Sequence, residues 1–184
     1  MKKIAVLFSG KGSNLEHILS TIHGKECQVV KVLTDNPMAN GIHIAKEYGV
    51  PVDIVNSSHY KCREDFDREV VKLLQKCQPE LTILAGFMRI LTPVFTEQVK
   101  AINLHPSLLP RHKGLHAIEK SYADLFPEGG VSVHRVSSEL DGGEIILQKK
   151  IHKMGLSFGQ YEEKIKMIEK EALIEAIKKT LIVK

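Results

Sequence analysis

Tryptophan, long apolar runs and a strong charge of one sign are all missing from this sequence of 184 residues. With no tryptophan and only 5% aromatic residues, base-stacking platforms for single-stranded nucleic acid are not expected. No stretch approaches the roughly 18 apolar residues of a transmembrane helix, so we expect no membrane partner. The formal net charge of +4 is too small and too dispersed to indicate a nucleic-acid partner. The composition is otherwise that of an ordinary globular protein, with 43% hydrophobic and 26% charged residues.

Cysteine is also scarce. Cys27, Cys62 and Cys77 form no CxxC pair, and an odd number cannot all pair within the chain. No cluster of His, Cys, Asp and Glu has metal-ligand spacing, so we expect no metal. The basic residues 1–3 and apolar residues 4–8 imitate a signal peptide, but the apolar run is too short. We therefore expect a cytoplasmic protein.

Short apolar runs alternate with helical patterns in the first part of the chain. Continuous apolar runs are typical of strands covered on both faces. Between them, residues 63–77 predict a helix that buries Phe66, Val70, Leu73 and Cys77. Strand, helix, strand in succession requires parallel pairing through right-handed crossovers. The pattern predicts an α/β fold with a Rossmann-like open, mostly parallel sheet and helices on both faces. The expected strands are residues 3–9, 27–34, 52–55, 81–85 and 101–104.

The pattern changes after about residue 115. Residues 131–136 and 144–151 predict two strands joined by a loop that contains Asp-Gly-Gly, which is typical of an antiparallel hairpin. A final helix is expected over residues 158–179, and the residues expected on its buried face are Tyr161, Ile165, Ile168 and Ala172. Because no repeat or linker interrupts the chain, we expect a single domain over residues 1–184.

The first candidate site is the turn after the first strand, residues 9–15 (SGKGSNL). Glycines allow a sharp turn and close approach of a ligand, and the following helix N-terminus binds phosphate through free N–H groups. The third glycine of the dinucleotide fingerprint and the Walker pattern are both absent. The alternative is an ordinary strand-to-helix turn in which Ser13 or Asn14 caps the helix.

The second candidate site combines Asn103, His105 and Asp141. Asn103 and His105 alternate on one side of the fifth strand, at the end where open α/β sheets bind ligands. An amide and an imidazole there are suited to stabilise an oxyanion, and a nearby carboxylate to hold the imidazole protonated or accept a proton from an amine. The alternatives are loop residues that satisfy backbone groups and, for Asp141, a common Asp-Gly turn.

The third candidate is the loop that follows the fourth strand, residues 86–91 (GFMRIL), which can wall a flat ring ligand. The alternative is core packing, which is favoured for Phe87 and Ile90. No Gly-x-Ser-x-Gly elbow is present, so a serine hydrolase is not expected.

Four motifs together resemble the phosphoribosylglycinamide formyltransferase family, folate-dependent enzymes of purine synthesis. The motifs are residues 8–15 (FSGKGSNL), 84–91 (LAGFMRIL), 102–110 (INLHPSLLP) and 139–143 (ELDGG). The resemblance covers nearly the whole chain and implies the formyltransferase fold. Related tRNA formyltransferases and formyltetrahydrofolate deformylases share the catalytic residues but carry an extra domain, for which we expect no room here.

The resemblance implies a role for each matching residue. Asn103, His105 and Asp141 correspond to the catalytic residues, and Gly12-Ser13-Asn14 to the cradle for the ribonucleotide phosphate. The residues implied in folate binding are Arg63, Met88, Arg89, Ile90, Leu91, Leu140 and Asp141. Glu169 matches a carboxylate that contacts the nucleotide, and Lys166 stands where a Gln is expected. Residues 111–114 (RHKG) also depart from the pattern, which commonly has proline before the glycine. The resemblance also suggests a cis peptide bond at Leu109-Pro110, which the sequence allows.

The implied reaction transfers the formyl group of 10-formyltetrahydrofolate to the amine of 5-phosphoribosylglycinamide. The expected partners are therefore small molecules, with formyl folate as co-substrate and no metal, and the chain is expected to be a monomer or homodimer. Two other classes stay open: a binding module that senses a phosphorylated metabolite or folate, and a deformylase in which water attacks in place of the amine.

Overall fold

The structure, a computed structural model, describes residues 1–182. It separates into two compact units, Met1–Ile102 and Asn103–Lys184, and each is described by itself. The boundary falls inside strand β5 (Ala101–His105). The single domain expected over residues 1–184 stays a prediction. Within the described residues, no helix is long and apolar enough to span a membrane.

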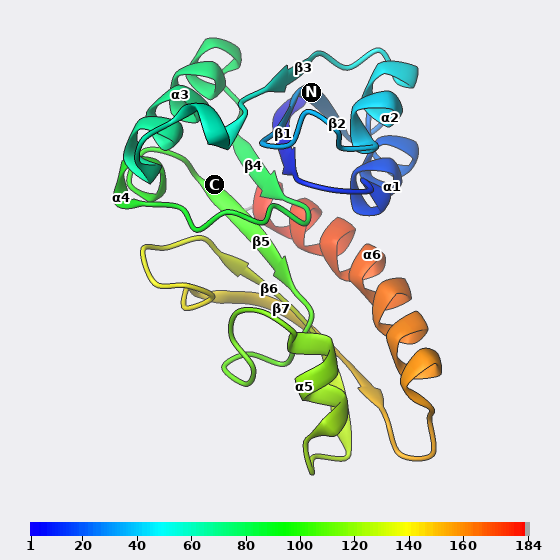
Figure 1. Cartoon of the computed structure of the whole chain (residues 1–184). Coiled ribbons are helices and arrows are strands. Elements are labelled where there is room, and N and C mark those ends of the chain that lie inside the picture. The colour runs from blue at the N-terminus through cyan, green and yellow to red at the C-terminus, as the bar shows by residue number, and fades with distance from the viewer. Residues whose placement is uncertain (183–184) are drawn as a thin grey trace. The chain divides into compact units, whose positions relative to one another are not determined.

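The first unit contains parallel strands in the order β3-β2-β1-β4. The central strand β1 pairs in parallel with both β2 and β4, and β2 pairs in parallel with β3. The apolar run Ile4 to Phe8 in β1 is fully buried, as expected for a strand covered on both faces. Figure 1 shows helices α1 and α2 on one side of these strands and α3 on the other. The strands are β1 (Lys2–Phe8), β2 (Cys27–Thr34), β3 (Val52–Ile54) and β4 (Leu81–Leu84).

The predicted helix over residues 63–77 is present as α3 (Arg63–Cys77). Phe66 and Val70 are buried as predicted, but Leu74 is buried in place of Leu73 and Cys77, which are half-buried. The buried stripe therefore follows an i, i+4, i+8 line instead of the expected i, i+4, i+7, i+11 line. The other helices of this unit are α1 (Ser13–Thr21), α2 (Gly41–Glu47), the short 3₁₀ helix η1 (Ser57–His59) and α4 (Pro93–Thr96).

The second unit contains the predicted antiparallel hairpin, formed by β6 (Glu128–Arg135) and β7 (Ile145–His152). Strand β6 begins three residues earlier than expected because Gly129 and Gly130 pair with β7, although glycine has a low strand propensity. Helix α6 (Phe158–Ile182) packs against both strands of the hairpin, and the shorter helix α5 (Ala117–Ala123) packs against α6. The predicted face of α6 is confirmed for Tyr161, Ile165 and Ala172, whereas Ile168 is half-buried.

The predicted fold class is confirmed. The first unit has the open parallel arrangement with helices on both faces, and the second has the antiparallel hairpin. The strand boundaries shift by up to three residues from the predicted ones. The Leu109-Pro110 peptide bond is cis, as the resemblance suggested.

Candidate active site

The second unit brings His105 and Asp141 together. Asn103 and His105 lie two residues apart in β5, which places their side chains on one face of the strand. Asp141 lies in the loop between β6 and β7. Nδ1 of His105 is 3.4 Å from Oδ2 of Asp141, and both side chains are less than a tenth exposed. The pair is therefore shielded from water, which strengthens the attraction between an imidazolium and a carboxylate.

Both ring nitrogens of His105 face acceptors. Nε2 lies 2.7 Å from the backbone carbonyl oxygen of His112, and Nδ1 faces the carboxylate of Asp141. A carbonyl oxygen only accepts, so Nε2 must carry a hydrogen. Nδ1 lies on the side of the Asp141 carboxylate, so a hydrogen on Nδ1 points toward that group.

Asp141 is held in place by its own backbone and by two partners. It adopts a left-handed backbone conformation with φ 50°, and its Oδ2 accepts from the N–H of Gly114 at 2.8 Å. Burial would raise the pKa of Asp141, but hydrogen bonds from His134 and Gly114 and the charge of His105 hold the pKa below its usual value. Gly143 is needed nearby, because a Cβ there would lie 1.8 Å from the carbonyl oxygen of Arg135.

His134 is a member of this site that the sequence analysis missed. Its Nε2 lies 3.4 Å from Nδ2 of Asn103 and 3.6 Å from Oδ1 of Asp141, while its Nδ1 lies 2.8 Å from the carbonyl oxygen of Arg135. The ring therefore bridges the amide and the carboxylate. The signal in the sequence was the alternation of Ser132 and His134 along β6. Such an alternating polar pattern usually faces solvent, whereas here both side chains are buried.

The predicted phosphate turn lies between β1 and α1 in the first unit. Gly12 is the N-cap of α1 in a left-handed conformation with φ 79°, and a Cβ on it would lie 2.7 Å from Cα of Gly41. Only glycine suits this position. The alternative in which Ser13 or Asn14 caps the helix is wrong, because Gly12 is the cap and no side chain bonds there. Ser13 is exposed and Asn14 is half-exposed, so both are accessible to a ligand.

The loop after β4 presents apolar side chains to solvent in the same unit. Met88 is 67% exposed and Ile90 is 50% exposed, while Phe87 and Leu91 are buried. Core packing is confirmed for Phe87, but it is wrong for Ile90. Ile90 lies beyond the end of the buried strand β4, in a segment without helix or strand.

A hydroxyl ties this loop to the phosphate turn. Oγ of Ser9 accepts from the N–H of Met88 at 2.8 Å and donates to Oδ1 of Asp35 at 2.6 Å. Nε of Arg89 lies 3.9 Å from Oδ2 of Asp35, and its guanidinium lies 5.7 Å from the ring centroid of Phe66. The two candidate binding segments of the first unit thus share one hydrogen-bonded support.

The remaining predicted residues lie outside these clusters. Arg63 is the exposed first residue of α3, and Leu140 is 49% exposed beside Asp141. Lys166 and Glu169 lie on α6, where Lys166 pairs with Glu162 at 3.2 Å. Arg63 therefore belongs to the first unit, and Leu140, Lys166 and Glu169 belong to the second.

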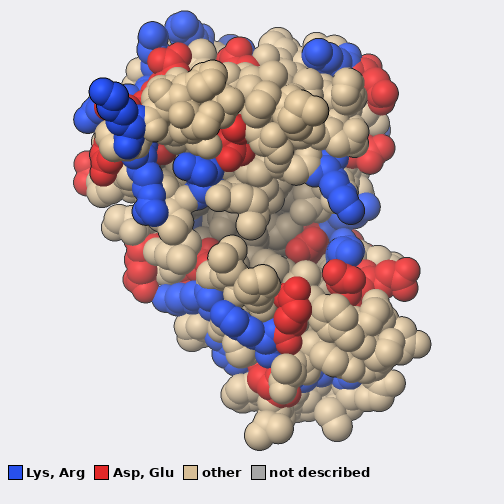
Figure 2. All heavy atoms as spheres, in the orientation of Figure 1, with Lys and Arg blue, Asp and Glu red and all other residues tan. Residues whose placement is uncertain are grey.

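Charge and metal-binding groups add little to the site. On the face drawn in Figure 2, basic and acidic side chains are intermingled, and pairs such as Lys113–Glu139 and Arg135–Glu144 lie in direct contact. Among residues 1–182, no group of three or more His, Cys, Asp and Glu side chains is placed to hold a metal ion.

Comparison with known proteins decides the family. The family model for formyl transferases matches residues 2–177, which is nearly the whole chain. The chain belongs to the formyl transferase family. The phosphoribosylglycinamide formyltransferase of Escherichia coli is 38% identical over 152 residues, covering 80% of this chain and 72% of that protein.

Solved structures and longer relatives agree with this assignment. The crystal structure of phosphoribosylglycinamide formyltransferase from Campylobacter jejuni has a TM-score of 0.96 and 49% identity, covering 98% of this chain and 97% of that chain. The human trifunctional purine biosynthetic protein adenosine-3 is 34% identical over 172 residues, which cover 91% of this chain but 17% of that protein. The formyl transferase fold predicted from the motifs is therefore confirmed.

Proposed function

We propose that this formyl transferase moves the formyl group of 10-formyltetrahydrofolate to the amine of 5-phosphoribosylglycinamide, a step of purine biosynthesis. The observation that carries the proposal is the buried pair of His105 and Asp141, with His134 linking Asp141 to Asn103. An amide and an imidazolium supply hydrogen-bond donors for an oxyanion, and the carboxylate supplies a base. Similarity to proteins named for this activity supports the choice of substrates.

The reaction begins with attack of the substrate amine on the formyl carbon. A C–N bond forms, and the electron pair of the carbonyl moves onto the formyl oxygen. Nε2–H of His105 is committed to the His112 carbonyl, so this oxygen shares Nδ1–H with the Asp141 carboxylate, which lies 3.4 Å from Nδ1. The Asn103 amide donates as well, because its Nδ2 carries two N–H groups and at most one of them is directed to the His134 ring, 3.4 Å away. Removing one such donor commonly costs about 3 kcal/mol.

Asp141 then accepts a proton from the amine and passes it on to the folate. The attacking nitrogen becomes cationic and transfers a proton to the Asp141 carboxylate, directly or through a water. The bond between the formyl carbon and N10 of the folate breaks, and N10 leaves with a proton, which returns Asp141 to its ionised form. The lowered pKa of Asp141 keeps the carboxylate ionised, and therefore able to accept a proton, at neutral pH. Because the amine attacks as the free base, a bell-shaped pH dependence is expected.

Each binding segment has a substrate in this proposal. Gly12, Ser13 and Asn14 bind the ribonucleotide phosphate through the N-terminus of α1, and Glu169 and Lys166 on α6 contact the nucleotide. The folate lies against the exposed side chains of the β4 loop. The residues assigned to folate are Arg63, Met88, Arg89, Ile90, Leu91, Leu140 and Asp141. The substrates are small metabolites of the cytoplasm, and the chain works as a monomer or homodimer.

An absorbance assay tests this function. Tetrahydrofolate release is measured from 10-formyltetrahydrofolate with and without 5-phosphoribosylglycinamide. The proposal expects release only with the ribonucleotide present. Tetrahydrofolate together with formate in the absence of ribonucleotide would identify a deformylase, and binding without turnover would identify a sensor.

A further inference from the structure

The loop between β5 and α5 carries a histidine whose side chain the reaction scheme does not use. The backbone carbonyl oxygen of His112 lies 2.7 Å from Nε2 of His105, and its ring Nε2 lies 2.7 Å from Oδ2 of Asp124. One residue therefore contacts the catalytic imidazole through its main chain and an acidic side chain through its ring.

Asp124 is a fixed point for this contact. It directly follows α5, and its side chain is only 14% exposed. Nζ of the buried Lys153 bonds both the carboxylate and the backbone carbonyl of Asp124, and Nη1 of Arg111 lies 3.3 Å from Oδ2. Burial would raise the pKa of Asp124, but hydrogen bonds from Lys153 and His112 outweigh it and lower the pKa to about 2. The carboxylate is thus ionised at neutral pH.

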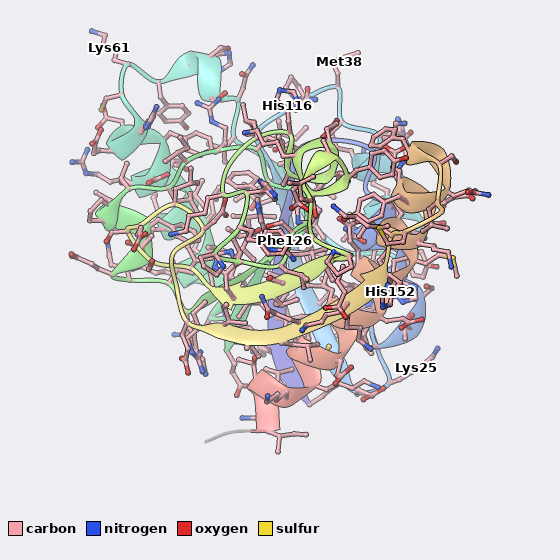
Figure 3. The ribbon with its side chains drawn as sticks, turned by 90° about the horizontal axis from the view of Figure 1, so that it is seen from below. Lys25, Met38, Lys61, His116, Phe126 and His152 are labelled. Carbon is pink, nitrogen blue, oxygen red and sulfur yellow. The ribbon has the colours of Figure 1, made fainter. Side chains whose placement is uncertain are left out.

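The backbone of His112 needs such an anchor. Its φ of 55° lies in the left-handed region, which costs a non-glycine residue free energy and persists where surrounding contacts impose it. On the side of His105, Oγ of Ser107 bonds the carbonyl of Arg111. The Arg111 guanidinium lies 4.2 Å from the ring centroid of Phe126, which is labelled in Figure 3, and its Nη2 donates to the carbonyl of Glu128 at 3.1 Å.

We propose that His112 is a positioning residue for His105. With its ring held by Asp124, His112 keeps its carbonyl oxygen against Nε2–H of the catalytic ring. That contact fixes the rotation of the ring and leaves Nδ1–H as the donor that faces Asp141. Without the His112–Asp124 pair, the carbonyl is free to turn away, and Nε2 loses its acceptor. The kinetic test of this inference rests on the proposed formyl transfer, whereas the NMR test of the His105 ring does not.

Three variants test the role by kinetics. His112→Ala removes the ring that pairs with Asp124, whereas His112→Asn keeps a donor and tolerates the left-handed backbone. His116→Ala is the matched control, because His116 has φ 59°, lies in the same loop and is exposed without a side-chain cap bond (Figure 3). We expect His112→Ala to lower kcat about tenfold, the worth of roughly one hydrogen bond, with both KM values within about twofold. His112→Asn should restore most of kcat, and His116→Ala should resemble the unchanged protein.

Nitrogen NMR of the His105 ring supplies a readout that does not depend on turnover. In the unchanged protein we expect a protonated, slowly exchanging Nε2–H at His105, and in His112→Ala a faster exchange of that hydrogen. An unprotonated Nε2 in the unchanged protein overturns the proposal, even where His112→Ala does not fold. Equal losses of kcat in His112→Ala and His116→Ala, or a folded His112→Ala with unchanged kcat, overturn it too. Absence of formyl transfer in the unchanged protein with this NMR signature intact would contradict the proposed function instead.

Discussion

Replacing Asp141 by asparagine isolates the charge of the proposed base. The substitution keeps the size of the side chain and an oxygen that can accept from Gly114. It removes the negative charge that lies 3.4 Å from the His105 ring. For two unit charges at that distance and an effective dielectric constant near 20, Coulomb's law gives roughly 5 kcal/mol. Because the carboxylate charge is shared between two oxygens, about half of this, roughly 2 to 3 kcal/mol, acts through the nearer one.

That energy converts directly into a rate. A loss of 2 to 3 kcal/mol in the stabilisation of the imidazolium in the transition state corresponds to a fall in kcat of roughly 100-fold. Loss of the proton acceptor adds to the effect. The assay is tetrahydrofolate release at saturating ribonucleotide and folate, with circular dichroism to verify the fold. The KM for the ribonucleotide should change little, because the phosphate turn is not altered, whereas Asp141 is itself one of the residues assigned to folate.

Glu139→Gln provides the matched control. Glu139 lies two residues before Asp141 and carries the same charge, but its side chain is 67% exposed and pairs with Lys113. Its replacement should leave kcat within about twofold, because exposed ion pairs contribute little. A folded Asp141→Asn variant that keeps kcat within about fivefold of the unchanged protein would refute the assigned role of Asp141.

Three further predictions concern stability and binding. Folding lowers the pKa of Asp124 from 3.8 to about 2, which is worth about 2 kcal/mol of folding free energy. This contribution to stability is present above pH 4 and is lost as the pH falls through 2. Asp124→Asn should therefore lower stability at pH 7 by about that amount and flatten the pH dependence between pH 4 and 2 in urea titrations. Gly12→Ala should weaken ribonucleotide binding and lower the melting temperature, because its Cβ would lie 2.7 Å from Cα of Gly41. Ile90→Ala should raise the KM for formyl folate about fivefold, through lost apolar contact, and leave the KM for the ribonucleotide unchanged in steady-state kinetics.

Local patterns were sufficient to predict most of the fold. The continuous apolar run Ile4 to Phe8 predicted a buried strand, and the helical spacing of apolar residues predicted the helix Arg63–Cys77. Both elements are present, with the strand residues buried and one face of the helix buried. Strand β6 was predicted too short because Gly129 and Gly130 gain their strand conformation from pairing with β7, which local propensity does not contain. The N-terminus of α1 was also misjudged, since the close approach of Gly41 to Gly12 decides that cap.

The candidate site was predicted in part for similar reasons. Asn103 and His105 were identifiable because period two at a strand end places both on one face. His134 was missed because its role depends on contacts with Asn103 and Asp141, which are 31 and 7 residues away in the sequence. The support that Asp35 gives to the phosphate turn and the β4 loop through Ser9 was missed for the same reason, because it joins residues far apart in the sequence.

The most direct test of formyl transfer follows the formyl carbon itself. 10-Formyltetrahydrofolate labelled with ¹³C in the formyl group is incubated with the protein and 5-phosphoribosylglycinamide, and the products are identified by NMR. The structure and the proposed mechanism predict that the label appears in an N-formyl amide of the ribonucleotide, with one tetrahydrofolate released for each amide formed. Label that appears in formate, or that stays on the folate when both substrates and folded protein are present, would contradict the proposed transfer.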